Sequence, residues 1–168
     1  MDSSQLEKLK PQLFALVRTS IKTTRMPYAT LLVDKRTGVV IARSYNDSVA
    51  SYDPSDQTDV VAIRKAKEAL EAKDLADMYL FSFFEPTVLS FDIAMFAKIT
   101  SFAWCISATD APEHYLITDY SVRVYDRDHP GKIQIMADYA KQEALGLLND
   151  PDIHIPRGYL LGGQGGDA

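Results

Sequence analysis

The stretch Asp53–Leu70 constrains the fold more than any other part of the chain. It passes from a polar loop into an amphipathic helix whose apolar residues recur at helical spacing: Val60, Ile63, Ala66 and Leu70. A second passage from polar residues into a helix, FFEPTVLSFDIAMFAKI, follows farther along the chain. Two helix N-termini of this kind can point toward one place, so the sequence predicts a polar site shared by the two helices.

Apolar strands flank these helices. Asp77–Phe84 contains MYLFSFF, which is typical of a buried strand, and Ser101–Ser107 predicts another. An alternation of strand and helix favours parallel strands, because each crossover then passes through a helix. Upstream, ATLLV and VVIA are separated by the turn DKRTG and predict an antiparallel hairpin. The expected fold class is α/β, with a mixed sheet and helices on both faces.

The two ends of the chain complete this arrangement. Ser3–Thr23 predicts a helix that Pro11 either kinks or begins. A short strand is expected within Tyr115–Val124 and a final helix over Lys132–Leu148. We expect a single domain over residues 1–160, followed by a flexible glycine-rich tail over residues 161–168.

Composition limits the partners and the compartment. The net charge of −5 and the pI of about 5.1 argue against a nucleic-acid partner, because phosphate binding needs a concentrated basic surface. No apolar run reaches the roughly eighteen residues that cross a bilayer, so we expect no membrane partner. The single cysteine, Cys105, cannot form an intramolecular disulfide, and the charged N-terminus lacks the pattern of a secretory signal. A cytoplasmic location is expected.

Four segments together resemble the cytidine deaminase-like superfamily, in particular its branch of guanine, tRNA adenosine and deoxycytidylate deaminases. MPYATLLVDKRTGVVIARSYN is similar to the first hairpin of that branch, and DPSDQTDVVAIRKA to the segment with its first zinc ligand. FSFFEPTVLSFDIAMFAKI is similar to the segment with the other two ligands, and WCISATDA to the next strand. The similarity covers Pro27–Ala111. It implies a three-layer α/β/α fold, a ligand of the nucleobase type and assembly as a homo-oligomer.

The chemistry of that family depends on zinc. An H-x-E motif supplies one ligand and a proton-shuttling glutamate, and a P-C-x-x-C motif supplies two thiolates. The matching positions in this chain hold Gln57, Asp59, Thr87 and Ser90. An amide oxygen and two hydroxyl groups are poor zinc donors near neutral pH, and aspartate is one methylene shorter than glutamate. The sequence therefore predicts that no zinc cofactor is bound, and it leans against an enzyme.

The same positions suggest a site for a small molecule. Asn46 matches an asparagine that bonds the ligand in relatives, and the alternative is a loop asparagine that bonds its own backbone. Glu85 matches the residue before the family's proline and pairs either with a ligand amine or with a backbone amide. The four candidates at the motif positions either line a ligand site or only stabilise the helix N-termini, as capping or negatively charged residues. The full candidate set is Asn46, Gln57, Asp59, Glu85, Thr87 and Ser90.

The remaining residues capable of chemistry are interpreted as structural. None of His114, His129 and His154 has a second ligand at metal-binding spacing. Cys105 lies in an apolar strand, where a buried thiol is expected. The aromatic residues of the predicted central strand favour core packing over base stacking: Tyr79, Phe81, Phe83 and Phe84.

Three hypotheses for the function remain open. The first is a catalytically degenerate, zinc-free deaminase-like protein that binds a nucleobase, nucleoside or similar molecule, or serves as a non-catalytic partner subunit. The second is a metal-free enzyme of altered chemistry with Asp59 as general base. The third is a structural or interaction module whose former pocket is filled by side chains. The sequence favours the first.

Overall fold

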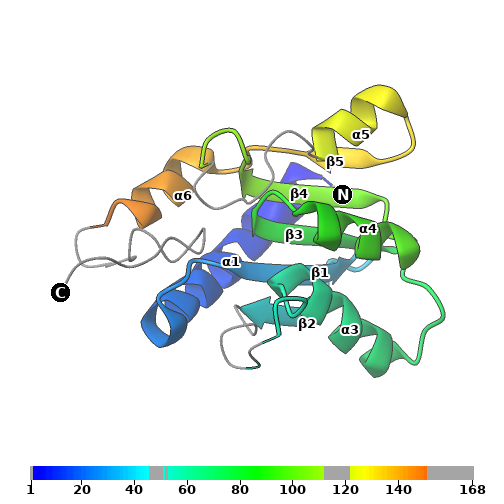
Figure 1. Cartoon of the computed structure of the whole chain (residues 1–168), viewed down its shortest axis with the longest axis horizontal. Helices are drawn as coiled ribbons and strands as arrows, with labels where there is room; N and C mark the ends of the chain where they lie inside the picture. Colours follow the sequence, from blue (N-terminus) through cyan, green and yellow to red (C-terminus); the bar gives the residue numbers. More distant parts are fainter. Residues whose placement is uncertain (1, 46–50, 52, 112–121, 151–168) are drawn as a thin grey trace.

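A five-stranded mixed sheet lies between two layers of helices (Figure 1). The computed structural model describes residues 2–45, 51, 53–111 and 122–150. Its elements in chain order are α1 (Ser3–Thr24), β1 (Ala29–Asp34), β2 (Val40–Tyr45), α3 (Thr58–Leu70), β3 (Met78–Phe84), α4 (Val88–Phe96), β4 (Ser101–Ile106), α5 (Val122–Asp128), β5 (Gln134–Met136) and α6 (Lys141–Leu148).

The strand order in the sheet is β2-β1-β3-β4-β5. Strand β1 is antiparallel to both β2 and β3, whereas β3, β4 and β5 run parallel to one another. The predicted α/β fold class, with its hairpin and its parallel strands, is confirmed. In the part of the chain that the structure describes, no helix combines the length and the apolar character needed to span a bilayer.

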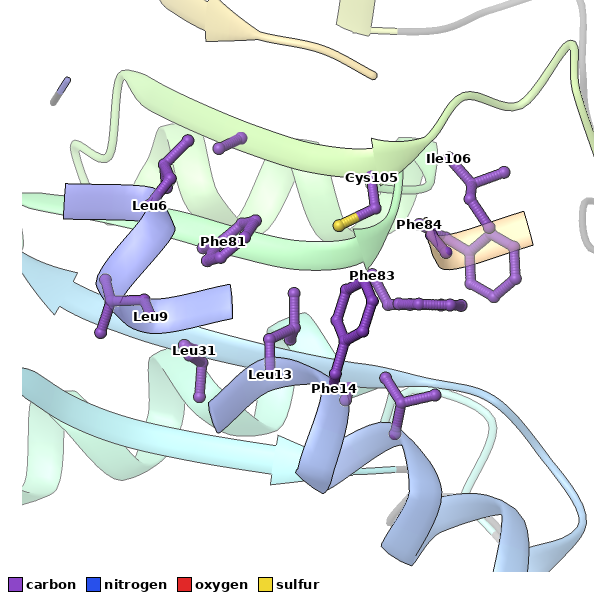
Figure 2. Close-up of a cluster of buried hydrophobic side chains, with 14 of the residues drawn as sticks. Leu6, Leu9, Leu13, Phe14, Leu31, Phe81, Phe83, Phe84, Cys105 and Ile106 are labelled. Carbon is purple, nitrogen blue, oxygen red and sulfur yellow. The ribbon is translucent and has the colours of Figure 1, made fainter. Parts of the chain in front are cut away.

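Alternation along the strands divides the core into two clusters, because successive side chains point to opposite faces of a sheet. Phe81 and Cys105 pack in the cluster that includes residues of α1 and α6 (Figure 2). Leu80 and Trp104, each one position away, pack in the cluster that includes residues of α3 and α4. The predicted aromatic core of β3 is confirmed. So is the buried thiol, since Cys105 is fully buried, and this burial raises the pKa of the thiol to about 12.

Helix α1 covers the first face of the sheet with one apolar stripe, which contains Leu6, Leu9, Leu13, Val17 and Ile21. The helix begins at Ser3 and is capped by Asp2, whose side chain accepts a hydrogen bond from the Gln5 backbone N–H at 2.9 Å. Pro11 lies inside it, and the helix continues to Thr24. The alternative in which the helix begins at Pro11 is therefore wrong.

The predicted final helix over Lys132–Leu148 is wrong in its first half. Gln134–Met136 forms β5, which pairs with β4, and only Lys141–Leu148 is helical. Between them, Asp138 and Ala140 adopt left-handed backbone conformations, with φ of 57° and 54°, which a continuous helix does not allow. Pairing with a distant strand leaves no mark on local periodicity, and the apolar spacing alone therefore suggested one helix.

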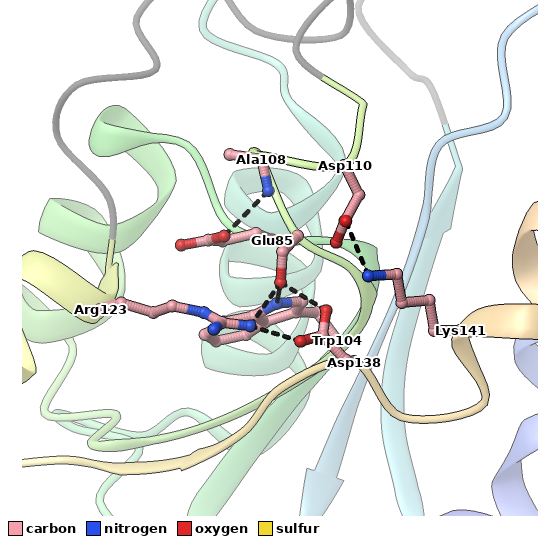
Figure 3. Close-up of polar contacts among 8 residues, drawn as sticks. Glu85, Trp104, Ala108, Asp110, Arg123, Asp138 and Lys141 are labelled. Carbon is pink, nitrogen blue, oxygen red and sulfur yellow. Dashed lines mark hydrogen bonds and ion pairs between the residues drawn. The ribbon is translucent and has the colours of Figure 1, made fainter.

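The strand expected within Tyr115–Val124 falls mostly on residues 112–121, which lie outside the described residues. The part that the structure describes begins helix α5 instead. Arg123 on this helix ties it to the sheet (Figure 3): its Nη2 donates to Ser107 Oγ at 2.7 Å and pairs with Asp138 Oδ2 at 2.6 Å. Trp104 Nε1 also donates to Ser107 Oγ, at 2.9 Å. These bonds join α5, the end of β4 and the turn after β5.

Candidate functional site

The start of α3 and the start of α4 meet at three hydrogen-bonded side chains. Gln57 immediately precedes α3, and Thr87 caps α4 by accepting a hydrogen bond from the Ser90 backbone N–H at 3.2 Å. Gln57 Oε1 accepts hydrogen bonds from Thr87 Oγ1 at 2.5 Å and from Ser90 Oγ at 3.0 Å. The structure thus brings together three of the predicted site residues, and we call them the Gln57 group.

Asp59 is buried in the first turn of α3, against the sheet. Its Oδ1 accepts hydrogen bonds from Thr30 Oγ1 at 2.5 Å and from Ser82 Oγ at 2.7 Å. Burial raises the pKa of Asp59, while the hydrogen bonds from Ser82, Thr30 and Ser90 act in the opposite direction. Because Ser90 contacts both Gln57 and Asp59, the Gln57 group and this carboxyl group form one connected network.

Thr30 and Ser82 are site residues that sequence reasoning missed. They pair directly across β1 and β3. Alternation along each strand places them on the same face as Leu32 and Leu80, which pack toward α3 and α4. The available signal was a single serine or threonine within each apolar run, ATLLV and MYLFSFF, since the short hydroxyl side chain of such a residue requires a hydrogen-bonding partner when it is buried.

The other candidates lie elsewhere. Glu85 follows β3 and is buried, and its Oε2 accepts a hydrogen bond from the Ala108 backbone N–H at 3.0 Å (Figure 3). Of the two partners that the sequence left open for Glu85, a ligand amine or a backbone amide, this contact is the backbone amide. Asn46, His114 and His154 lie outside the described residues. His129 stacks on Tyr125, with ring centroids 4.4 Å apart, at the end of α5.

The Gln57 group does not fit the zinc site of an H-x-E and P-C-x-x-C family. Its donors are one amide oxygen and two hydroxyl groups, which are neutral and already hydrogen-bonded to one another. Within the described ranges, no group of three histidine, cysteine, aspartate or glutamate side chains is placed to hold a metal ion. We therefore derive no chemical step through a metal at these three positions.

The hydroxyl group of Thr87 is expected to contribute to stability through both of its contacts. Thr87→Val keeps the shape of the side chain but removes the cap of α4 and the bond to Gln57, so the free energy of unfolding should fall by about 1–2 kcal/mol. Urea denaturation of this variant beside Thr87→Ser, which keeps the hydroxyl group, measures the difference. Equal stability of the two variants would contradict the assigned capping role.

Comparisons with known proteins identify the fold and the relatives. No protein-family model matches the chain. A curated guanine deaminase of Bacillus subtilis is 31% identical over 87 residues, which are 52% of this chain and 54% of that protein. The chain thus aligns with about half the length of this relative. A solved structure of guanine deaminase from Bacillus subtilis superposes with a TM-score of 0.60 at 25% identity, over 76% of this chain and 80% of that one. The chain belongs to the cytidine deaminase-like superfamily.

Two further structures share the fold of this superfamily member. One is a protein in complex with 2,6-diaminopurine, with a TM-score of 0.73 and 19% identity over 82% of this chain and 76% of that one. The other comes from studies of tRNA:A34 deaminases, with a TM-score of 0.69 and 21% identity over 84% of this chain and 99% of that one. At these identities the likeness concerns the fold.

These relatives correct the functional interpretation of the sequence. The chain was expected to be catalytically degenerate and not an enzyme, and that expectation is contradicted because its relatives are guanine deaminases. The two alternatives, a metal-free enzyme of altered chemistry and a filled structural module, fall with it. The prediction that zinc is absent is contradicted as well, since guanine deaminases are zinc-dependent.

Proposed function

We propose that this chain acts on a guanine-type purine base as a deaminase. The observation that carries the proposal is the connected network at the starts of α3 and α4, where the buried carboxyl group of Asp59 lies behind the Gln57 group. The aligned segments of guanine deaminase support the substrate class. A structure with the same fold holds 2,6-diaminopurine, which supports a purine as ligand.

Hydrolytic deamination replaces an exocyclic amine by oxygen. Water forms a bond to the ring carbon that carries the amine, protons pass from the water to the ring nitrogen and to the amine, and the carbon–nitrogen bond breaks as ammonia leaves. The reaction therefore needs a group that accepts a proton and gives it back. Asp59 suits this role, because burial raises the pKa of its carboxyl group above the ordinary aspartate value, which favours holding a proton.

The surrounding hydroxyl groups act on Asp59 as positioning residues. Thr30 and Ser82 approach the same carboxylate oxygen from two neighbouring strands, which fixes the orientation of the carboxyl group against the rigid sheet. Ser90 approaches it from α4. A proton-transfer group held from three elements retains its geometry while substrate binds.

The test is an assay of the purified protein with guanine, in which release of ammonia and formation of xanthine are measured together. Asp59→Asn should reduce turnover by at least about a hundredfold, the usual contribution of a positioned acid–base group, while the variant remains folded. Metal content should be measured on the same preparation, and the assay repeated with added zinc. Absence of ammonia release under both conditions, or full activity of Asp59→Asn, would overturn the proposal.

A further inference from the structure

We propose that Gln57 selects the base by donating a hydrogen bond from its amide Nε2 to the 6-oxo oxygen of the purine. This inference rests on the proposed function, since it assigns a contact within the same site. Gln57 stands at the position of the histidine in the family's H-x-E motif. A carboxamide group differs from an imidazole group in shape and in its hydrogen-bond donors, so the role of that histidine cannot be transferred to Gln57.

The orientation of the Gln57 amide follows from its contacts. Thr87 Oγ1 already accepts a hydrogen bond from the Ser90 backbone N–H, and its own proton points to Gln57 at 2.5 Å. A separation of 2.5 Å lies in the range of O–H···O bonds and is too short for N–H···O bonds. Oε1, not Nε2, therefore faces Thr87. The second bond, from Ser90 Oγ, reaches the same oxygen.

Fixing the oxygen also fixes the nitrogen, because a carboxamide group is planar. With Oε1 directed to α4, the Nε2 group lies on the opposite edge of the amide and carries two protons and no lone pair for bonding. Across the described ranges of the chain, Nε2 has no hydrogen-bond acceptor. Gln57 and Thr87 are partly exposed, whereas Asp59 and Ser90 are buried. Gln57 and Thr87 are therefore the members of the network that a ligand can reach, and the hydroxyl group of Thr87 is already engaged with Ser90 and Gln57.

An amide donor held in this way distinguishes an oxo group from an amine. A carbonyl oxygen of the base accepts from Nε2, whereas an exocyclic amine in the same place would bring two donors together and leave both unsatisfied. In a guanine-type base the carbonyl oxygen is the 6-oxo group. In 2,6-diaminopurine an amine replaces it, so the two purines test the contact at a single position.

Binding of guanine and of 2,6-diaminopurine should be measured by calorimetry on the wild type, Gln57→Glu and Gln57→Met. The wild type should bind guanine at least about tenfold more tightly than 2,6-diaminopurine, because a buried donor without an acceptor is costly. Gln57→Glu keeps the two bonds from Thr87 and Ser90, since a carboxylate accepts both, but offers an acceptor where Nε2 was. It should therefore lose the preference for guanine or reverse it. Gln57→Met, which is uncharged and similar in length, should bind guanine and 2,6-diaminopurine with similar affinity.

The outcomes separate this inference from the proposed function. If the wild type binds guanine more tightly and both variants keep the same ratio of affinities, Gln57 does not read the 6-oxo group and only this inference fails. If the wild type binds neither purine, the proposed function fails and this inference fails with it. Thermal unfolding of each variant confirms that the comparison is made between folded proteins.

Discussion

Replacing Phe81 by alanine is expected to lower the free energy of unfolding by about 3–5 kcal/mol. Phe81 is fully buried at the centre of β3, between β1 and β4, and its ring packs edge-on against Tyr139 with centroids 5.9 Å apart. The ring belongs to the cluster between the sheet and α1 (Figure 2), so its removal leaves a cavity there. Urea denaturation followed by circular dichroism measures the loss.

Phe96 provides the matched control, because it is the same residue type on the surface. Its side chain is 92% exposed at the end of α4, so Phe96→Ala should change the free energy of unfolding by less than about 0.5 kcal/mol. If Phe81→Ala does not fold, Phe81→Leu reports the same site with a smaller loss of about 1–2 kcal/mol. Equal losses at Phe81 and Phe96 would show that the assigned core is not what stabilises the sheet.

Most of the fold could be predicted because its central part follows local rules. The hairpin, α3, β3, α4 and β4 each carry their own periodicity and turn residues, and their order implies parallel pairing. β5 could not be predicted, because three residues become a strand only through their pairing with β4.

The grouping of the candidate site residues could be predicted only in part, and for a different reason. Gln57, Asp59, Thr87 and Ser90 could be grouped because a family resemblance aligned two distant segments, and the structure brings them into one network. The inward-facing hydroxyl groups of the strands could not be assigned a partner from sequence, since that requires the register of β1 against β3. The functional conclusion failed because it inferred a loss of activity from residue types alone, while the relatives of the chain are enzymes.

The wild-type protein is expected to lose stability relative to the Asp59→Asn variant as pH rises, because of the buried carboxyl group of Asp59. Burial raises the pKa of Asp59 in the folded protein above its ordinary value of 3.8. Between these two pKa values, the folded protein holds a proton that the unfolded chain has lost. The folded state then binds more protons, so the contribution of Asp59 to stability falls with increasing pH until the folded group ionises too. Asparagine does not titrate, and its side-chain oxygen still accepts from Thr30 and Ser82.

The measurement is the melting temperature of both proteins over a series from about pH 3 to pH 8, expressed as the difference between them. Other carboxyl groups, such as Asp34 and Asp138, have lowered pKa values and give the opposite slope, but they are common to both proteins and cancel in the difference. The two curves should meet near the acid end and separate as pH rises, with Asp59→Asn the more stable. Parallel curves would mean that Asp59 titrates like an exposed aspartate. The proposed proton transfer by Asp59 near neutral pH would then lose its physical basis, because an ordinary aspartate is already ionised well below neutral pH.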